Sequence, residues 1–260
     1  MYALYEIGKG TKTTITPENS NRTGINSGLV GHWTFDGKNM TNTTALDSSG
    51  NGRTGTLTNM TGSSSKIVGK LGQGLRFDGS NDLVNIPYNG IDFEYTQPIT
   101  ISAWVKLNDV TPPGGMQTIF GRLFGSGPAT GTFLSWCRAA VAGVCNANSF
   151  ALYLANNYTA DGVIVSTATN SARPNAWTHI TATYDGSGEA GGVSLYINGS
   201  FKSPTIHVDN LSSSITGTED WMIGDDGTSD NTSGIIDDVR FYNRELTAKE
   251  VKTLYKLGAQ

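Results

Sequence analysis

Apolar and polar residues alternate over much of the 260-residue chain, a pattern typical of β-strands that face a core on one side only. The alternation is clearest in ITISAWVKL (99–107), WTHITATYD (177–185) and VSLYI (193–197). Asn198-Gly199 favours a type I′ turn that folds 193–197 back onto 200–207. Further strands are predicted at 29–35, 74–78, 82–87, 118–123, 150–155, 163–167, 220–224 and 234–243. About a dozen short strands at this spacing are typical of a sandwich or jelly roll.

The last residues change to a helical period. Thr247 and Glu250 have the spacing of a capping box. An apolar stripe at helical spacing follows, formed by Val251, Leu254, Tyr255 and Leu257. Gly258 is a common helix terminator. We therefore predict one short C-terminal helix that packs its stripe on the sandwich.

Composition supports an all-β class and restricts the partners. The chain contains 33 Gly and only 15% charged residues, which fits short strands joined by tight turns. The net charge is −4, and no cluster of Lys and Arg supplies the basic surface that nucleic acids or anionic membranes require. No apolar run approaches the roughly 20 residues that span a bilayer. We expect neither a nucleic-acid partner nor membrane insertion.

The two cysteines, Cys137 and Cys145, lie in SWCRAAVAGVCNAN. A disulfide between them would close a loop of about nine residues and contribute roughly 2–3 kcal/mol in the chain-entropy model. A Gly- and Asn-rich chain that is poor in Lys suggests an oxidising, extracellular setting. We predict the disulfide, with two unrelated thiols as the alternative. The spacing does not fit a zinc site, because no second pair is present.

The chain begins and ends on similar phrases, LYEIG at 4–8 and LYKLG at 254–258. This repetition predicts a tandem array in which residues 1–27 are the tail of a preceding module and a linker. Residues 28–260 would then form the domain. Chance similarity over five positions is the alternative. The start MYALYEIGKG lacks the basic flank and apolar core of a signal peptide.

Seven motifs occur in a fixed order: GLVGHWTFDG (28–37), DSSGNGRTGTL (47–57), GKLGQGLRFDGSNDLVNIP (69–87), TISAWVKL (100–107), WTHITATYDGS (177–187), VSLYING (193–199) and GIIDDVRFYNRELTAKEV (234–251). Together they resemble a laminin-G-like domain of the concanavalin A-like lectin/glucanase superfamily, over about residues 28–257. The resemblance implies a jelly roll of two antiparallel sheets with a short C-terminal helix. It also implies that 108–148 is an irregular surface insertion.

The resemblance further implies one structural calcium ion between the first and last strands. In related glucanases an Asp two positions before a Val in the last strand is a ligand, which indicates Asp237. Backbone carbonyl groups near Thr34 and near Gly72 or Gly74 would complete the site, since Ca²⁺ prefers oxygen ligands. Asp36 and Asp47 are further carboxylates within reach. Asp36 precedes a Gly and Asp47 opens DSSGNG, so turn capping is the alternative for both.

No motif for catalysis is present. Retaining glycosidases need two carboxyl groups about 5 Å apart, and the nearest match is Asp92 with Glu94 in GIDFEYTQP. This pair lacks a third acid and precedes the strand at 99–107. The histidines His32, His179 and His207 are scattered and have no nucleophile motif beside them. We expect no enzymatic activity.

Carbohydrate recognition needs exposed aromatic rings beside amide or carboxylate groups. Trp136 and Tyr158 lie in irregular, polar surroundings and are the predicted ligand contacts. Trp104, His179 and Tyr196 fall on the strand faces opposite the aliphatic residues, where they either line a concave sheet or pack.

These observations favour a non-catalytic recognition or adhesion module at the cell surface or outside the cell. A glycan or a matrix component is the expected partner, together with neighbouring modules of the same larger protein, and a structural calcium is the expected cofactor. The first alternative is a spacer repeat without a ligand of its own, and the more distant one is a glycoside hydrolase. A spacer should bind no glycan, and a hydrolase should release reducing ends.

Overall fold

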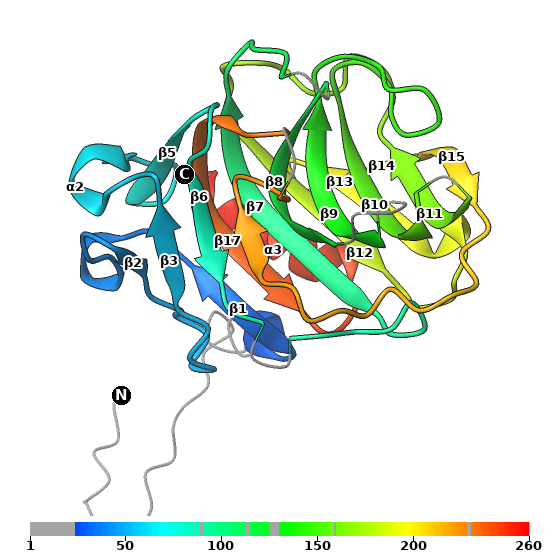
Figure 1. The fold of residues 1–260 in the computed structure, drawn as a ribbon, viewed down its shortest axis with the longest axis horizontal. Helices are drawn as coiled ribbons and strands as arrows, with labels where there is room; N and C mark the ends of the chain where they lie inside the picture. Colours follow the sequence, from blue (N-terminus) through cyan, green and yellow to red (C-terminus); the bar gives the residue numbers. More distant parts are fainter. Residues whose placement is uncertain are drawn as a thin grey trace, which may run out of the picture.

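Two antiparallel β-sheets packed face to face form the molecule, with the C-terminal helix on the outside (Figure 1). The computed structural model describes residues 24–259 except 89–90, 113–114, 125–129, 159 and 228–229. The predicted all-β jelly-roll sandwich with a C-terminal helix is confirmed. Within the described residues, no helix has the length and apolar character that a membrane span needs.

Sheet A contains eight strands, and β17 lies near its centre. Its order is β14 (Ser200–Lys202), β13 (Val193–Ile197), β12 (Thr178–Tyr184), β7 (Ile99–Leu107), β17 (Ser233–Tyr242), β5 (Gln73–Asp78) and β4 (Lys66–Val68). The first strand, β1 (Leu29–Trp33), also pairs with β17. The last strand of the chain therefore holds β1, β5 and β7 together.

Sheet B contains nine strands. Its order is β15 (Thr205–Asp209), β11 (Asp161–Ser166), β10 (Ser149–Asn157), β9 (Thr130–Cys137), β8 (Met116–Phe124), β16 (Trp221–Ile223), β6 (Leu83–Ile86), β3 (Gly55–Thr58) and β2 (Thr44–Ala45). Short helical segments occur at α2 (Gly62–Ser65) and as 3-10 turns at Gly37–Asn39 and Ala190–Gly192.

The main core lies between the sheets and is built around aromatic side chains. Phe120 of sheet B stacks on Trp221 with ring centroids 5.1 Å apart, and both contact Phe241 of sheet A. Trp33 of β1 lies 5.8 Å from Phe120. Each such ring removes a large apolar area from water, so this cluster joins the first and last strands to sheet B.

The outer face of sheet A is covered by α3 (Ala248–Gly258), which begins with the predicted capping box of Thr247 and Glu250. Val251 and Leu254 are fully buried against the sheet. The Tyr255 ring lies over Trp104 at 5.6 Å. Gly258 approaches the same indole so closely that a Cβ there would lie 2.7 Å from its Nε1.

Trp104, His179 and Tyr196 are thereby assigned a packing role. They lie on the outer face of sheet A as the alternation predicts, but they are buried beneath or beside α3. They do not line an open sheet.

Residues 108–148 are not an irregular insertion, and this expectation from the resemblance is wrong. They contain β8 and β9, which lie in the middle of sheet B. The sequence of β9 hides its strand character because both faces are buried. Leu134 and Trp136 enter the main core, while Phe133 and Cys137 belong to a second apolar cluster. A strand buried on both faces shows no alternation.

The segment just before the predicted domain start contacts α3. Ile25 is 3% exposed and packs with Leu254. Arg244 donates hydrogen bonds to the carbonyl groups of Gly24 and Ser27 and forms an ion pair with Glu250. Residues 1–23 lie outside the described residues, so the tandem array and the boundary after residue 27 stay predictions.

Candidate functional site

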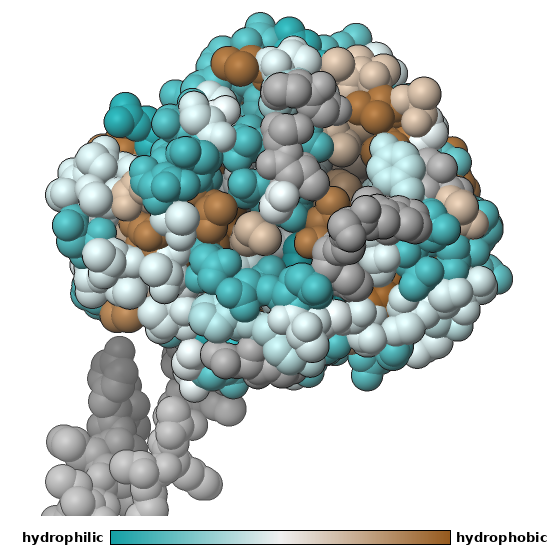
Figure 2. Space-filling view, viewed as in Figure 1, coloured by the Kyte–Doolittle hydropathy of each residue, from teal (hydrophilic) through white to brown (hydrophobic). Residues whose placement is uncertain are grey.

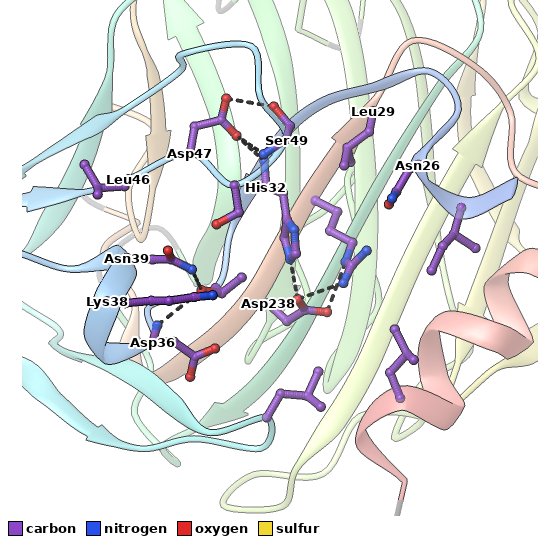
Figure 3. A pocket seen from close by; sticks show the side chains of 16 residues that line it. Asn26, Leu29, His32, Asp36, Lys38, Asn39, Leu46, Asp47, Ser49 and Asp238 are labelled. Carbon is purple, nitrogen blue, oxygen red and sulfur yellow. Dashed lines mark hydrogen bonds and ion pairs between the residues drawn. The ribbon is translucent and has the colours of Figure 1, made fainter. Parts of the chain in front are cut away.

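A β-bulge in β17 places two consecutive carboxylates on the outer face of sheet A. The pairing of β17 with β7 shifts register between Asp237 and Arg240. Asp238 has a φ of 48°, a left-handed conformation that non-glycine residues rarely adopt. Bulges of this kind redirect side chains at functional sites. Asp238 therefore points toward β1 and not along the strand (Figure 3).

Asp238 joins His32 and Arg240 in a buried polar network. Its Oδ1 lies 2.5 Å from Nε2 of His32, and both its oxygens accept hydrogen bonds from the Arg240 guanidinium. Burial would raise the pKa of Asp238, but the Arg240 charge and the His32 hydrogen bond hold that pKa well below its ordinary value. The three side chains thus form a fixed, charged floor.

A pocket of about 830 Å³ lies above this floor. Its polar wall comes from the segment after β1, and its apolar wall comes from β1 and the end of α3 (Figure 3). The lining includes three of the predicted metal residues, Thr34, Asp36 and Asp47, together with Leu71 and Leu257. The sequence prediction therefore brought together residues that share one cavity.

Asp47 holds the turn that it opens. Its oxygens accept hydrogen bonds from the backbone N–H groups of His32, Ser49 and Arg53 and from the Ser49 hydroxyl, at 2.7–2.9 Å. Burial would raise the pKa of Asp47, but these hydrogen bonds outweigh it and lower the pKa. With four hydrogen bonds, Asp47 has little capacity left for a metal.

Asp36 and Asp237 both accept hydrogen bonds from the backbone of one loop, residues 69–73. Oδ1 of Asp36 accepts from the Gln73 N–H at 3.0 Å, and Thr34 Oγ1 accepts from the Asp36 N–H. Oδ2 of Asp237 accepts from the N–H groups of Lys70 and Leu71 at 2.7 and 2.8 Å.

Gly72 lies at the tip of this loop with a φ of 66°. A Cβ at Gly72 would lie 2.2 Å from Oδ1 of Asp36, so the close approach of Asp36 requires glycine there. The Gly72 carbonyl accepts from Gly69 N–H at 3.1 Å.

Asp237 has one oxygen without a partner. The residue is 0% exposed, and its Oδ1 is buried with no hydrogen-bond donor. Burial raises the pKa of Asp237 to about 7, against the lowering effect of the Leu71 and Lys70 hydrogen bonds. An orphaned carboxylate oxygen in this position calls for a proton or a cation. Within the described residues, no group of three Asp, Glu, His or Cys side chains could hold a metal, so backbone carbonyl groups would have to contribute.

The outer face of sheet B carries a different set of side chains. The predicted disulfide between Cys137 and Cys145 is present and lies on this face with Val144. Phe133 stacks on Tyr153 with ring centroids 4.3 Å apart. Apolar side chains gather on this side of the molecule in the upper right of Figure 2.

Tyr158 lies at the edge of this aromatic stack. Its ring centroid is 5.7 Å from that of Tyr153, and the side chain is partly exposed. Burial and the charge of Asp230 raise the pKa of the Tyr158 hydroxyl group. Of the two predicted ligand contacts, Tyr158 therefore keeps an accessible ring.

Trp136, the other predicted contact, is buried, and the idea that it is an exposed loop aromatic is wrong. It lies on β9, is 1% exposed and belongs to the main core. The misreading followed from treating 108–148 as a loop.

Three buried carboxylates lie in the segment GDDGTSDN, and the sequence analysis did not identify them. Asp226 accepts a hydrogen bond from Thr118 Oγ1, and Asp230 accepts one from the Met116 N–H. Asp225 accepts from the next two backbone N–H groups. Burial and the nearby Asp226 raise the pKa of Asp230 to about 6. The signal for this cluster was three Asp residues within six positions.

The network at the pocket floor was also missed, because His32 was judged alone. Its partners are more than 200 positions away, and only the pairing of β1 with β17 brings them together.

Asp92 and Glu94, the nearest match to a catalytic pair of carboxyl groups, both have structural contacts. Asp92 forms an ion pair with buried Arg122, and Glu94 accepts from the Ser214 hydroxyl.

Comparison with known proteins identifies the fold family. A family model described as the concanavalin A-like lectin/glucanases superfamily matches residues 78–252. No curated protein matches in sequence. Among solved structures, domain 4 of AbnA, an extracellular GH43 arabinanase from Geobacillus stearothermophilus solved with arabinotriose, has a TM-score of 0.61 and 22% identity. The match covers 87% of this chain and 98% of that domain.

Two other similar structures are larger. The receptor binding domain of botulinum neurotoxin D has a TM-score of 0.62 at 18% identity, with 89% of this chain and 53% of that chain covered. A Trypanosoma rangeli sialidase has a TM-score of 0.60 at 17% identity, with 90% and 34% covered. The present chain thus spans about half the toxin domain and about a third of the sialidase. At these identities the likeness shows the fold alone.

Proposed function

The chain belongs to the concanavalin A-like lectin/glucanases superfamily, and from this premise we propose that it is a non-catalytic, extracellular module that binds glycans on the outer face of sheet B. One neighbour, matched over 98% of its length, is a domain solved with arabinotriose, and others are receptor binding domains of toxins. These likenesses support recognition as the activity class.

The observation that carries the proposal is the placement of Tyr158. Its partly exposed ring packs at a tilt of 46° against Tyr153, which stacks on Phe133, and this contact restrains the ring before any ligand arrives. A rigid aromatic side chain gives contact area at low entropic cost. Asp230 lies close enough to affect the Tyr158 hydroxyl group, and a carboxylate there can accept hydrogen bonds from sugar hydroxyl groups.

The test is retention of the chain on immobilised neutral oligosaccharides, with arabinotriose among them, followed by titration of those that bind. Tyr158→Ala should weaken binding by about five- to tenfold, since loss of one ring contact costs about 1 kcal/mol or slightly more. Tyr158→Phe should bind nearly as the original chain does. Phe201→Ala is the matched control, because Phe201 is 55% exposed on sheet A.

Failure of the unmodified chain to retain any oligosaccharide would overturn the proposal and favour the spacer alternative. An equal loss of oligosaccharide binding in Phe201→Ala would show that binding is not specific to the outer face of sheet B.

A structural calcium ion at Asp237 is the second part of the proposal. The residues present fit such an ion, because Asp237 Oδ1 is buried without a donor and Asp36 reaches the same loop. Asp237 and Asp36 would hold the ion with backbone carbonyl groups near Thr34 and Gly72, and the ion would supply positive charge that fixes loop 69–73.

Calcium should therefore stabilise the fold in a pH-dependent way. Because the folded pKa of Asp237 is raised to about 7, the proton on Asp237 stabilises the fold fully below about pH 4, and this contribution is lost as pH rises toward 7. A metal replaces the proton, so the gain should be larger at pH 8 than at pH 5. At 100 times its dissociation constant the ion would add about 2.7 kcal/mol.

Thermal unfolding with Ca²⁺ or EDTA at both pH values provides the measurement, with Asp237→Asn as the variant that should not respond. Equal unfolding temperatures with and without Ca²⁺ at pH 8 would reject the metal and leave the glycan proposal untouched.

A further inference from the structure

A second pocket on sheet A is lined by two positively charged side chains. It encloses about 280 Å³ and is bordered by Arg76, Lys106, Asn108, Asn175, Gly234 and Ile235. It lies apart from both sites described above, since none of its lining residues belongs to the larger pocket or to sheet B.

The register of three central strands creates this pocket. Ile235 of β17 pairs with Arg76 of β5 on one side and with Lys106 of β7 on the other. Strands in a sheet are about 4.8 Å apart, so the two cationic residues stand roughly 10 Å apart on one face. Ile235 lies between them as an apolar floor.

The polar lining consists of cations and amides, and no carboxylate contributes to it. The chain as a whole has a net charge of −4, so the pocket differs in sign from the average of the molecule. Among the described residues, neither Arg76 nor Lys106 forms a hydrogen bond or ion pair through its side chain. Two unpaired cations facing one small volume create a positive potential there.

Two nearby carboxylates, Asp78 and Asp82, reduce this positive potential without cancelling it. Burial and the charge of Asp78 raise the pKa of Asp82, while the charge of Arg76 acts in the opposite direction. Arg76 is therefore within electrostatic range of Asp82. Asp78 already accepts a hydrogen bond from the Ser80 N–H, and Asp82 accepts one from the Asp78 N–H.

The backbone at the open end of the pocket is fixed. Gly234 has a φ of 146°, and a Cβ there would lie 2.5 Å from the Lys106 carbonyl oxygen, so only glycine permits this close packing. The Asn175 N–H donates to the Leu107 carbonyl group at 2.7 Å. Asn108 donates through its amide to Ser233 Oγ at 3.0 Å. The Asn108 amide and the Asn175 backbone therefore have defined positions before a ligand binds.

We propose that this pocket binds an oxyanion, a carboxylate, sulfate or phosphate group carried by a small ligand, between Arg76 and Lys106. Guanidinium and ammonium groups form charge-assisted hydrogen bonds with such groups. The apolar floor of Ile235 takes the carbon side of the group that carries the anion. The inference is independent of the proposed glycan site, which lies on the other sheet.

The experiment is an NMR titration of the full chain with glucuronate, inorganic sulfate and inorganic phosphate, with neutral glucose as reference. Amide signals of residues 106–108 and 234–235 should shift with at least one anion and not with glucose. Glucuronate alone indicates a carboxylate ligand, whereas sulfate or phosphate alone indicates a tetrahedral one. Shifts should diminish as salt increases, because salt screens exposed charges.

Arg76→Gln combined with Lys106→Gln should weaken anion binding by about tenfold or more, and Arg76→Gln alone by about three- to fivefold. The matched control is Lys249→Gln with Lys252→Gln, an equal change in charge at exposed positions of α3 outside the pocket. The proposal is overturned if no anion shifts these signals, if glucose shifts them equally, or if both double variants bind alike.

Discussion

The outer faces of the two sheets differ in the polarity of their buried side chains. The outer face of sheet A carries many polar side chains, and all of the following are buried: Thr100, Ser102, His179, Thr181, Asp238 and Arg240. His179 lies beneath Tyr255 of α3, and Asp238 and Arg240 form the floor of the larger pocket. The outer face of sheet B carries Met116, Phe133, Tyr153, Ile164 and Val208, an apolar set that no described helix covers. The more polar face is the one that the helix covers.

The difference shows that hydrogen bonding, and not hydropathy alone, permits burial. On sheet A several of the polar groups pair with one another, as when His179 Nε2 pairs with Ser102 Oγ at 3.0 Å and Thr181 donates to Ser102. His179 Nδ1 and Asp237 Oδ1 are among the exceptions, since both are buried without a partner. Paired polar groups avoid most of the desolvation cost, so a helix can cover them. On sheet B the apolar side chains are buried without a helix, and the disulfide-bonded residues Cys137 and Cys145 belong to the same cluster.

Leu254→Ala should have the largest effect on stability, because it removes the main apolar contact between α3 and sheet A. Leu254 is fully buried, and such truncations cost about 2–5 kcal/mol. Urea unfolding gives this free energy. Lys252→Ala on the exposed side of the same helix should change it by less than about 0.5 kcal/mol. A loss below about 1 kcal/mol for Leu254→Ala would mean that α3 is not a structural cover.

Removal of the disulfide should have the next largest effect and should act on sheet B. Cys137→Ser with Cys145→Ser frees a loop of about nine residues, and the expected loss is about 2–3 kcal/mol. If the disulfide loop supports the aromatic stack, the same variant should also weaken oligosaccharide binding. Unchanged unfolding under reducing conditions would contradict the first expectation.

Lowering the pH should change the free energy of unfolding in opposite directions through one residue on each face, His179 on sheet A and Asp230 beside sheet B. Burial lowers the pKa of His179 to about 3, with Asp238 opposing and Arg240 assisting, so neutral His179 loses its stabilising effect as pH falls from 6.5 toward 3. Burial raises the pKa of Asp230 to about 6, so its proton stabilises the fold below about pH 4 and is lost as pH rises through 6. Each group contributes a slope of at most about 1.4 kcal/mol per pH unit.

His179→Gln should therefore flatten the acid side of the stability curve, and Asp230→Asn should remove part of the decline between pH 4 and 6. Urea unfolding at a series of pH values measures both. Parallel curves for either variant and the original chain would show that the residue does not titrate as its surroundings imply.

Where alternation or capping signals were strong, the sequence was sufficient. The predicted strands 99–107 and 193–197 match β7 and β13, and the capping box of Thr247 and Glu250 is present. These signals are local, since they depend on neighbours a few positions away. The disulfide was also accessible from spacing and composition.

What the sequence left hidden depends on contacts across the fold. The strand β9 is buried on both faces, so its alternation disappears, and Trp136 was consequently misplaced in a loop. The pocket between Arg76 and Lys106 exists only through strand register. Register between distant strands cannot be read from one sequence, because it is set by packing and turn geometry together.

The central place of β17 determines when the chain can fold as it is synthesised. Strands β1, β5 and β7 all pair with β17, so sheet A lacks its middle until residue 242 has left the ribosome. At about 5–20 residues per second, the 135 positions that separate Leu107 from Tyr242 take roughly 7–27 s to translate. Throughout that time β7 has no neighbour on one side, and its apolar residues remain available to export factors or chaperones. Stalled nascent chains that expose the sequence to residue 230 should be cut readily by protease, and those that expose it to residue 259 should resist.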